Sequence, residues 1–441
     1  MNLDFFKNKK ILIMGLGIHG GGVGTARFFA QLGAKLTITD LKTEKELKKS
    51  LDQLKKFNNI KFVLGRHREE DFQNQDLIIK NPAVRWNSPY LKIAKKNKIP
   101  IQSDASLYFL LTPSYTIGVT GTKGKSTTCN LIYQVLKRKY EVVLGGNIGI
   151  SLLEILPQLN SRKIVVAELS SWQTETLKFV KKSPQIAIIT NISSDHLNTY
   201  PSFQDYVEAK FLIARWQKKE DEFILPKNLS KYFFYFNKNK KWKFQSKVTF
   251  YQISKNFEKK LAKNDFKLLG QGAKNNAFLA FKIGKLFGLE ENEIFKTLSK
   301  IKPLFGRLQP IKKKNLLWVN DTCSTNPFAT IQSIKSFNKK IILITGGTDK
   351  NLPTKDLAKV IKKNVKKLIL LSGSFTEKLK RELPKNFGHE TSSLKTAVLL
   401  AKKYAKKNDI ILFSPASASF ELFKDEFERG RKFLRLVKEL V

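Results

Sequence analysis

The segment Gly118-Val119-Thr120-Gly121-Thr122-Lys123-Gly124-Lys125-Ser126-Thr127 carries the strongest local pattern in the chain. It continues an apolar stretch that begins at Tyr115 and leads into a stretch with helical spacing, so we predict a strand, a glycine-rich loop and a helix. Glycines let backbone N–H groups close around a phosphate, and the N-terminus of the helix adds positive potential. The pattern therefore indicates a phosphate-binding loop.

Two side chains of this loop have chemistry that suits a bound triphosphate. Lys125 would reach the β- and γ-phosphates, and the Ser126 hydroxyl would be offered to magnesium. The general pattern has glycine where Val119 stands, and the nearer Gly121 makes the loop shorter. The alternative is a glycine-rich turn before an ordinary helix. The combination of strand, loop, Lys-Ser pair and helix favours phosphate binding.

A second glycine-rich loop lies near the N-terminus. An apolar strand over residues 9–14 leads into Gly15-Leu16-Gly17-Ile18-His19-Gly20, a helix follows over about 23–32, and the next strand ends at Asp40. This arrangement matches the dinucleotide fingerprint in form. It supports a nucleotide-binding loop without identifying the nucleotide.

Strands and helices alternate along the whole chain, which predicts an α/β fold. Linkers near Thr112-Pro113-Ser114 and Ile301-Lys302-Pro303 divide it into three domains. We predict a Rossmann-like nucleotide-binding domain over 1–113, a P-loop ATPase-type parallel sheet over 114–302 and a Rossmann-like domain over 303–441. Within the second domain, the lysine- and aromatic-rich stretch 227–267 suggests short strands and loops.

Composition limits the class of protein. The net charge is +44, but only about a dozen basic residues are arginine and the lysines are spread along the chain, so we expect no nucleic-acid partner. No apolar run is long enough to span a membrane, and the first ten residues are too polar for a signal peptide. The two cysteines, Cys129 and Cys323, fit a reducing cytoplasm.

A further set of polar residues follows strands of the central domain. Glu168 comes directly after the apolar stretch 164–167, and Asp195-His196 follow a strand that ends near Thr190. Ligands of open α/β sheets bind at the carboxyl ends of strands. A carboxylate and an imidazole near a triphosphate suit magnesium. Each residue alone is more often a cap or a loop residue, and Lys210 alone is more often part of a solvated helix face.

Taken in order, these segments resemble the Mur ligases over essentially the whole chain. Residues 120–127 resemble the family's ATP loop, and Gly145-Gly146-Asn147-Ile148-Gly149 resembles its muramoyl-peptide loop. Glu168-Leu169-Ser170-Ser171-Trp172-Gln173 is close to the form found in the D-glutamate-adding member. Asp195-His196 and Tyr206-Val207-Glu208-Ala209-Lys210 resemble the family's magnesium histidine and carbamoylated lysine.

The resemblance implies a role for each matching position. ATP would contact Gly121, Thr122, Lys123, Gly124, Lys125, Ser126, Thr127, Asn276, Arg307 and Asp321. Mg²⁺ would be held by Ser126, Thr127, Glu168, His196 and a carbamoylated Lys210, with Lys125, His196 and Lys210 as the catalytic residues. The uridine nucleotide substrate would contact Gly15, Leu16, Gly17, Asp40 and Asn147, and the acceptor amino acid would contact Thr325, Lys350, Ser419 and Phe427.

The implied activity is ATP-dependent ligation of D-glutamate to UDP-N-acetylmuramoyl-L-alanine through an acyl phosphate, by a cytoplasmic monomer that supplies cell-wall peptidoglycan precursors. Another acceptor, such as L-glutamate, stays open. Gly272-Ala273 and Cys323 depart from the family's His-Asn pair and lysine. A dehydrogenase would leave the second glycine-rich loop unexplained, and a nucleic-acid-dependent ATPase would leave the acceptor motifs unexplained.

Overall fold

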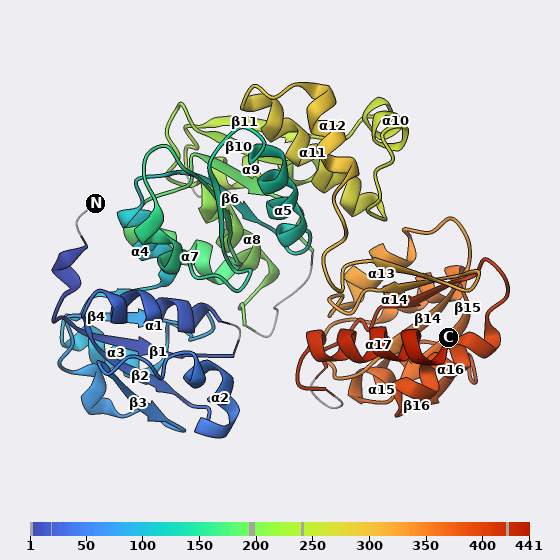
Figure 1. The fold of residues 1–441 in the computed structure, drawn as a ribbon, viewed down its shortest axis with the longest axis horizontal. Coiled ribbons are helices and arrows are strands. Elements are labelled where there is room, and N and C mark those ends of the chain that lie inside the picture. The colour runs from blue at the N-terminus through green and yellow to red at the C-terminus, as the bar shows by residue number, and fades with distance from the viewer. Residues whose placement is uncertain (1–2, 19, 194–198, 240–241, 420–422) are drawn as a thin grey trace. The chain divides into compact units, whose positions relative to one another are not determined.

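The computed structural model describes residues 3–18, 20–193, 199–239, 242–419 and 423–441. The chain forms two compact units. The first comprises Met1–Gly121, Thr128–Ile192 and Gln204–Gln252, and the second comprises Thr122–Thr127, Ser193–Phe203 and Ile253–Val441. Within the described residues there are three sheets, each with its own helices (Figure 1), two in the first unit and one in the second. None of the helices in this part of the chain is long and apolar enough to cross a membrane.

The N-terminal sheet is wholly parallel, with strand order β3-β2-β1-β4-β5. Its central strand, β1, is buried over Ile11 to Met14, as its apolar sequence predicts. The strands are β1 (Lys10–Met14), β2 (Lys35–Asp40), β3 (Ile60–Leu64), β4 (Leu77–Lys80) and β5 (Ile101–Gln102), and the helices are α1 (Gly21–Gln31), α2 (Glu44–Asp52), α3 (Pro89–Lys96) and α4 (Asp104–Leu111).

The central sheet is also parallel, in the order β11-β10-β9-β6-β8-β7. Strands β6, β8 and β9 have almost no exposed residues, which fits a sheet covered on both faces. The elements are β6 (Tyr115–Thr120), α5 (Lys125–Leu136), β7 (Val142–Gly146), α6 (Leu152–Ile155), β8 (Ile164–Glu168), α7 (Ser171–Val180), β9 (Ile186–Ile189), α8 (Phe203–Phe211), β10 (Glu222–Pro226), α9 (Ser230–Asn239) and β11 (Lys247–Tyr251).

The stretch 227–267 differs from its sequence-based interpretation as strands and loops. Among the described residues of this stretch, only β11 is a strand, and helices α9 and α10 (Lys255–Lys263) fill most of the rest. Phe233 and Phe236 are buried and stand three residues apart, on one face of α9. The lysine- and aromatic-rich composition of this stretch therefore concealed a helical period. Two further helices, α11 (Gln271–Leu286) and α12 (Glu291–Ser299), follow.

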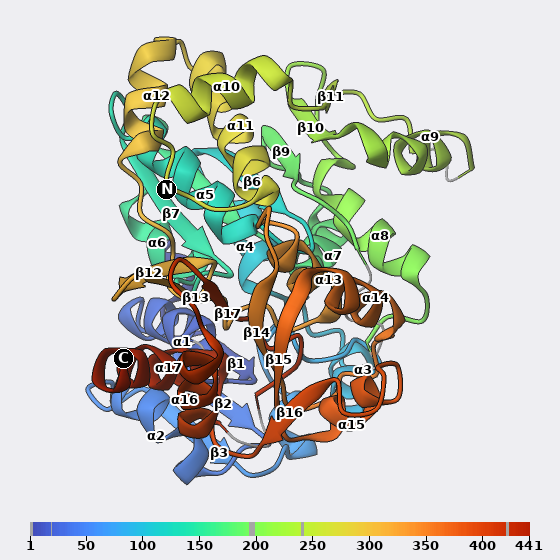
Figure 2. The ribbon, with the colours of Figure 1, turned by 90° about the vertical axis from the view of Figure 1, so that its right-hand side faces the viewer.

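The C-terminal sheet is mixed, with the order β12-β13-β17-β14-β15-β16 and only the β12–β13 pair antiparallel. Figure 2 shows α16 and α17 on one face and α13 and α14 on the other. The elements are β12 (Gln309–Lys313), β13 (Leu316–Asn320), α13 (Pro327–Ile334), β14 (Ile341–Gly346), α14 (Lys355–Asn364), β15 (Val365–Leu371), α15 (Ser374–Lys380), β16 (Gly388–Thr391), α16 (Leu394–Tyr404), β17 (Ile410–Phe413) and α17 (Glu426–Leu440). The predicted three-domain α/β fold is thus confirmed, and the sequence analysis missed the edge strands β12 and β16.

The two sheets of the first unit are joined by contacts between their helices and loops. Arg27 on α1 forms an ion pair with Glu154 on α6. The Thr25 and Ser151 hydroxyls are 3.1 Å apart. An added Cβ at Gly24 would come within 2.4 Å of Glu154 Oε2, so only glycine allows this close approach without displacing the carboxylate.

Lys80, the last residue of β4, is buried in this unit. Its Nζ donates to Asn81 O at 3.1 Å and lies 4.7 Å from the centre of the Trp86 ring. Burial lowers its pKa to about 8, although the nearby carboxylates of Glu175 and Asp104 act in the opposite direction. The folded chain therefore disfavours the charged form of this amine.

We expect this burial to make stability depend on pH. Between pH 8 and the ordinary lysine pKa the unfolded chain keeps a proton that the folded chain releases, so stability rises with pH across this window. Lys80→Met does not titrate and has a similar shape. Denaturant unfolding of both proteins at pH 7 and pH 10 should show wild type gaining roughly 2–3 kcal/mol relative to the variant. If the difference in unfolding free energy between the two proteins does not change with pH, the lowered pKa of Lys80 is contradicted.

Candidate functional site

The Asp40 carboxylate fixes the conformation of the N-terminal glycine-rich loop through a hydrogen bond. Gly15 and Gly17 both have positive φ, 92° and 65°, where side chains are strained. Gly17 N donates to Asp40 Oδ2 at 2.9 Å, and Lys42 N donates to Asp40 Oδ1 at 2.9 Å. The predicted nucleotide contacts Gly15, Leu16, Gly17 and Asp40 are thus brought together. Both oxygens of Asp40 already accept backbone N–H groups, and its role toward uracil stays a prediction.

This loop also meets the predicted muramoyl-peptide loop. An added Cβ at Gly20 would be 2.9 Å from the carbonyl oxygen of Gly149. Within the latter loop, Asn147 N donates to Glu168 O at 2.8 Å, and Asn147 Nδ2 donates to Glu168 Oε1 at 3.2 Å. Asn147 therefore connects the loop after β7 with the end of β8.

The predicted phosphate-binding loop has the backbone geometry that its sequence predicts. Strand β6 ends at Thr120 and α5 begins at Lys125, with Gly121 and Gly124 both at positive φ, 145° and 85°. An added Cβ at Gly121 would come within 2.0 Å of Thr190 Oγ1. The Lys125 amine donates to Thr122 O at 3.3 Å and so folds over the loop.

A residue that the sequence analysis did not single out also supports this loop. Ser193 N donates to Thr122 Oγ1 at 3.0 Å, and the Thr122 hydroxyl lies 3.3 Å from Ser193 O. The sequence contains a pattern that could have identified Ser193, because this residue follows an apolar strand by a few positions, as the predicted ligands do. The chain after β9 therefore touches the phosphate loop.

The buried carboxylate of Glu168 lies at the carboxyl edge of the central sheet. Glu168 is the last residue of β8, pairs with Val119 of β6 and is 2% exposed. Its Oε2 is buried and accepts no hydrogen bond within the described part of the chain. A buried carboxylate oxygen without a donor is costly unless a cation neutralises it. The donor set therefore fits a divalent cation with oxygen ligands.

Lys210 on α8 reaches the start of the phosphate loop. It is 1% exposed, its Nζ donates to Gly121 O at 3.0 Å, and the amine lies 4.5 Å from the centre of the Tyr206 ring. It is therefore not part of a solvated helix face. His196, which also belongs to the predicted metal set, lies outside the described residues, and its role stays a prediction.

The sequence predicts three ATP contacts outside the phosphate loop, and two of them, Arg307 and Asn276, lie against that loop. Arg307 Nη2 donates to Ser126 Oγ at 3.2 Å. A Cβ added at Gly124 would be 2.8 Å from Asn276 Oδ1, so Asn276 borders the loop closely. The departures at Gly272-Ala273 lie in the first turn of α11, the same helix that carries Asn276.

Asp321, the third of these contacts, is engaged within its own domain. Its carboxylate accepts from the Ser333 hydroxyl at 2.6 Å, the Ser414 hydroxyl at 2.8 Å and Leu308 N at 3.2 Å. Burial raises its pKa, although these hydrogen bonds act in the opposite direction. Asp321 thus ties β13 to α13 and β17, and its role toward ribose stays a prediction.

The predicted acceptor contacts lie on loops at the carboxyl edge of the C-terminal sheet and at the start of α17. Lys350 Nζ donates to Thr325 Oγ1 at 3.3 Å. Ser419 is buried, whereas Phe427 is half exposed and its ring centre is 6.2 Å from that of Phe305. A lysine amine, hydroxyls and an aromatic ring could together hold an amino acid that carries carboxylates.

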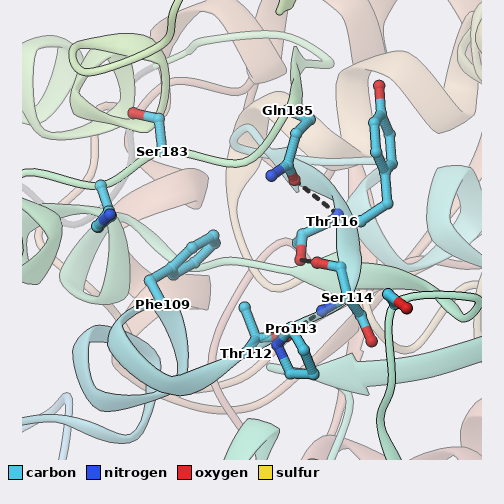
Figure 3. Close-up of a pocket in the computed structure, with 10 residues that line it drawn as sticks. Phe109, Thr112, Pro113, Ser114, Thr116, Ser183 and Gln185 are labelled. Atoms are coloured by element: carbon cyan, nitrogen blue, oxygen red, sulfur yellow. Dashed lines mark hydrogen bonds between the residues drawn. The ribbon is translucent and has the colours of Figure 1, made fainter.

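One cavity lies away from all of these residues. It encloses about 330 Å³ at the amino ends of the central strands. Figure 3 shows it between Phe109, Thr112 and Ser114, which precede β6, and Ser183 and Gln185, which precede β9. The phosphate loop is at the other end of β6. Since parallel sheets bind ligands at the carboxyl ends of their strands, this cavity is not the candidate site.

The comparisons with known proteins agree on one family. Three family models match the chain: the N-terminal domain of MurD-like Mur ligases over residues 9–103, the Mur ligase middle domain over 119–286 and the Mur ligase glutamate ligase domain over 306–417. The UDP-N-acetylmuramoylalanine--D-glutamate ligases of Borreliella afzelii and Borreliella burgdorferi are 40% and 41% identical to it, with 100% of each chain covered.

Solved structures share the fold at low sequence identity. The MurF ligase of Thermotoga maritima, in complex with ADP, matches with a TM-score of 0.61 at 15% identity and covers 100% of this chain and 99% of its own. The UDP-N-acetylmuramate-alanine ligase MurC of the same organism has a TM-score of 0.59 at 18% identity, with 98% and 99% covered. At this identity the likeness supports the three-domain fold alone.

Proposed function

This chain belongs to the Mur ligase family, whose members form amide bonds at the expense of ATP, and we propose that it joins D-glutamate to UDP-N-acetylmuramoyl-L-alanine. The observation that carries the proposal is the buried, half-satisfied Glu168 carboxylate beside the strand that leads into the phosphate loop. It occurs in a chain that aligns from end to end with D-glutamate ligases. The product would serve peptidoglycan synthesis in the cytoplasm, and the enzyme would act as a monomer.

The first half of the reaction needs two anions to meet. The carboxylate of the L-alanyl group attacks the γ-phosphorus of ATP, ADP leaves, and an acyl phosphate forms. Lys125 and the backbone N–H groups of the loop would hold the β- and γ-phosphates, and Arg307 would add a second positive charge. Ser126, Thr127, Glu168, His196 and Lys210 would hold Mg²⁺. When bound, Mg²⁺ supplies positive charge that offsets repulsion between the two anions.

The second half of the reaction forms the amide. The amine of D-glutamate attacks the acyl carbonyl carbon, phosphate leaves, and one proton is lost from the nitrogen. Thr325, Lys350, Ser419 and Phe427 would orient the acceptor so that its amine faces that carbon. Gly15, Leu16, Gly17, Asp40 and Asn147 would hold the uridine nucleotide and the muramoyl group at the other end.

We propose that Lys210 carries a carbamate. An unmodified ammonium has no lone pair and cannot ligate a metal ion, whereas a carbamate has two anionic oxygens. The carbamate nitrogen retains one N–H, so it can keep the hydrogen bond to Gly121 O. Glu168 alone would leave the site short of negative charge, which supports this modification.

The proposed activity is tested by phosphate release with purified enzyme, ATP, Mg²⁺ and UDP-N-acetylmuramoyl-L-alanine, with each amino acid added in turn. D-Glutamate should give phosphate and a ligated product whose mass equals both substrates less one water. Faster turnover with L-glutamate would establish the alternative acceptor. Phosphate release that is independent of any amino acid would overturn the ligase assignment.

Cys323 provides a test of the acceptor region. It stands at a position where the resemblance leads us to expect lysine, and burial raises the pKa of its thiol. We predict that Cys323→Lys lowers the KM for D-glutamate several-fold, because an added cation attracts the carboxylates of the acceptor. The KM for ATP should not change. Cys323→Met, which adds length without charge, is the matched control, and an effect on the KM for ATP alone would show that the position is misassigned.

A further inference from the structure

Arg429 is a charged residue that the proposed reaction does not yet use. It lies near the start of α17 and is 1% exposed, among the largest fully buried side chains of the described residues. Burial lowers its pKa to about 10, so it stays a cation at neutral pH. Burying a guanidinium costs free energy of desolvation unless most of its N–H donors form hydrogen bonds.

Its hydrogen bonds connect two loops at the carboxyl edge of the C-terminal sheet. Toward the loop after β13, Nε donates to Thr322 Oγ1 at 3.1 Å and Nη2 donates to Thr322 O at 2.9 Å. Toward the loop after β17, Nη1 donates to Ala418 O at 3.2 Å, and both terminal nitrogens lie 3.4 Å from Ser417 O. The planar guanidinium of arginine has enough donors, in a fixed geometry, to form hydrogen bonds with both loops at once.

The same network extends to a third loop, the one after β14. Ala418 O also accepts from Thr348 N at 3.2 Å, and Ala418 N donates to Thr348 O at 3.1 Å. The Ser417 hydroxyl donates to Gly346 O at 2.7 Å. Arg429 therefore sits at the junction of the three loops that follow β13, β14 and β17.

Each of these loops carries one proposed acceptor contact. Thr325 follows Thr322 by three residues, Lys350 follows Thr348 by two, and Ser419 follows Ala418 directly. Phe427, the fourth contact, precedes Arg429 by two residues. A shift of any one loop would therefore move its proposed acceptor contact away from the other contacts that bind the same ligand.

The charge of Arg429 is not neutralised by the groups that it contacts. Its five hydrogen bonds to described residues all end on carbonyl or hydroxyl oxygens, and the Glu426 carboxylate, which interacts with the guanidinium electrostatically and acts to raise its pKa, accepts none of them. In a buried setting such a charge is weakly screened. It therefore contributes positive potential at the edge where Lys350 lies, which favours a ligand with more than one carboxylate.

We propose that Arg429 is a positioning residue for the acceptor amino acid. It fixes the relative places of the three acceptor-binding loops, and its buried positive charge selects a dicarboxylic acceptor over a monocarboxylic one. This inference rests on the proposed function, because it concerns the acceptor of that ligation.

The test compares Arg429→Lys and Arg429→Met with Arg431→Met, an exposed arginine on the same helix. Steady-state KM and kcat are measured for each of the three substrates with the full-length enzyme, together with the midpoint of thermal unfolding. Arg429→Lys keeps the charge but loses the planar guanidinium, so its KM for D-glutamate should rise at least tenfold. Arg429→Met loses both and should show a larger rise. The KM values for ATP and the uridine nucleotide should stay within twofold, and Arg431→Met should match wild type.

A purely structural role gives a different result. Fewer correctly folded molecules would lower kcat and leave every KM unchanged, and this outcome would overturn the proposal. Equal increases in all three KM values would also overturn it. If Arg429→Met does not fold, Thr322→Val removes the acceptor of the Nε hydrogen bond while keeping the side-chain shape, and the same selective rise in KM, smaller in size, is expected. Wild-type enzyme that does not ligate D-glutamate would refute the proposed function, whereas active wild type with unaffected Arg429 variants would refute only this inference.

Discussion

Lys125→Ala should abolish phosphate release while the fold is retained. The Lys125 amine lies over the phosphate loop and bonds to the backbone of Thr122, and the side chain is partly exposed and outside the hydrophobic core. Its removal leaves charge on the transferred phosphoryl group uncompensated. We expect turnover to fall at least about a hundredfold, the size seen when one donor to developing charge is lost.

The measurement is phosphate release with all three substrates saturating, accompanied by the thermal unfolding midpoint. Lys137→Ala is the matched control, because Lys137 is an exposed lysine just beyond the other end of α5. Its turnover should equal that of wild type. Normal turnover of a correctly folded Lys125→Ala protein would remove the assignment of this loop as the phosphate site.

Lys210→Ala should lose almost all ligase activity and still bind ATP. The variant removes the buried amine that reaches Gly121 O, and with it the proposed carbamate ligand. The space left behind can admit a small carboxylate, so acetate at high concentration should restore part of the activity. Lys210→Arg fills that space with a fixed cation and should stay inactive under the same treatment.

Two observations would contradict the carbamate. The first is near-normal turnover of Lys210→Ala without added acid. The second is a free Lys210 amine, shown by the intact mass of the protein under conditions in which it is active. ATP binding by the inactive variants, followed by equilibrium titration with a fluorescent ATP analogue, controls for damage to the phosphate loop.

The parts of the fold that sequence predicted are those set by local patterns. The glycines of the two loops and the apolar strands before them required no knowledge of distant contacts, and both strand-loop-helix units are confirmed. Strand β12 was missed because Gln309–Lys313 contains a proline and lysines and is half exposed at the sheet edge. Helix α9 was missed because its aromatic residues pack against residues outside the helix, such as Phe244 and Phe250.

The candidate site also contains some features that the sequence predicts and others that it does not. Sequence placed Glu168 at the end of a strand, and it is the last residue of β8. It gave no sign that one carboxylate oxygen would be buried without a donor, because that depends on packing around the side chain. Arg429 went unnoticed for the same reason, since the four oxygen atoms that accept its hydrogen bonds belong to residues that are 11, 12 and 107 positions away along the chain. The domain boundaries and the individual residue roles stay predictions.

The central claim is that the chain activates its carboxylate substrate as an acyl phosphate. The most direct measurement uses UDP-N-acetylmuramoyl-L-alanine with both alanyl carboxylate oxygens replaced by ¹⁸O, together with ATP, Mg²⁺ and D-glutamate. Because the attacking oxygen stays with phosphorus when the amine displaces phosphate, the released phosphate should carry one ¹⁸O and the new amide should keep the other. Released phosphate without ¹⁸O, alongside ligated product, would contradict the mechanism.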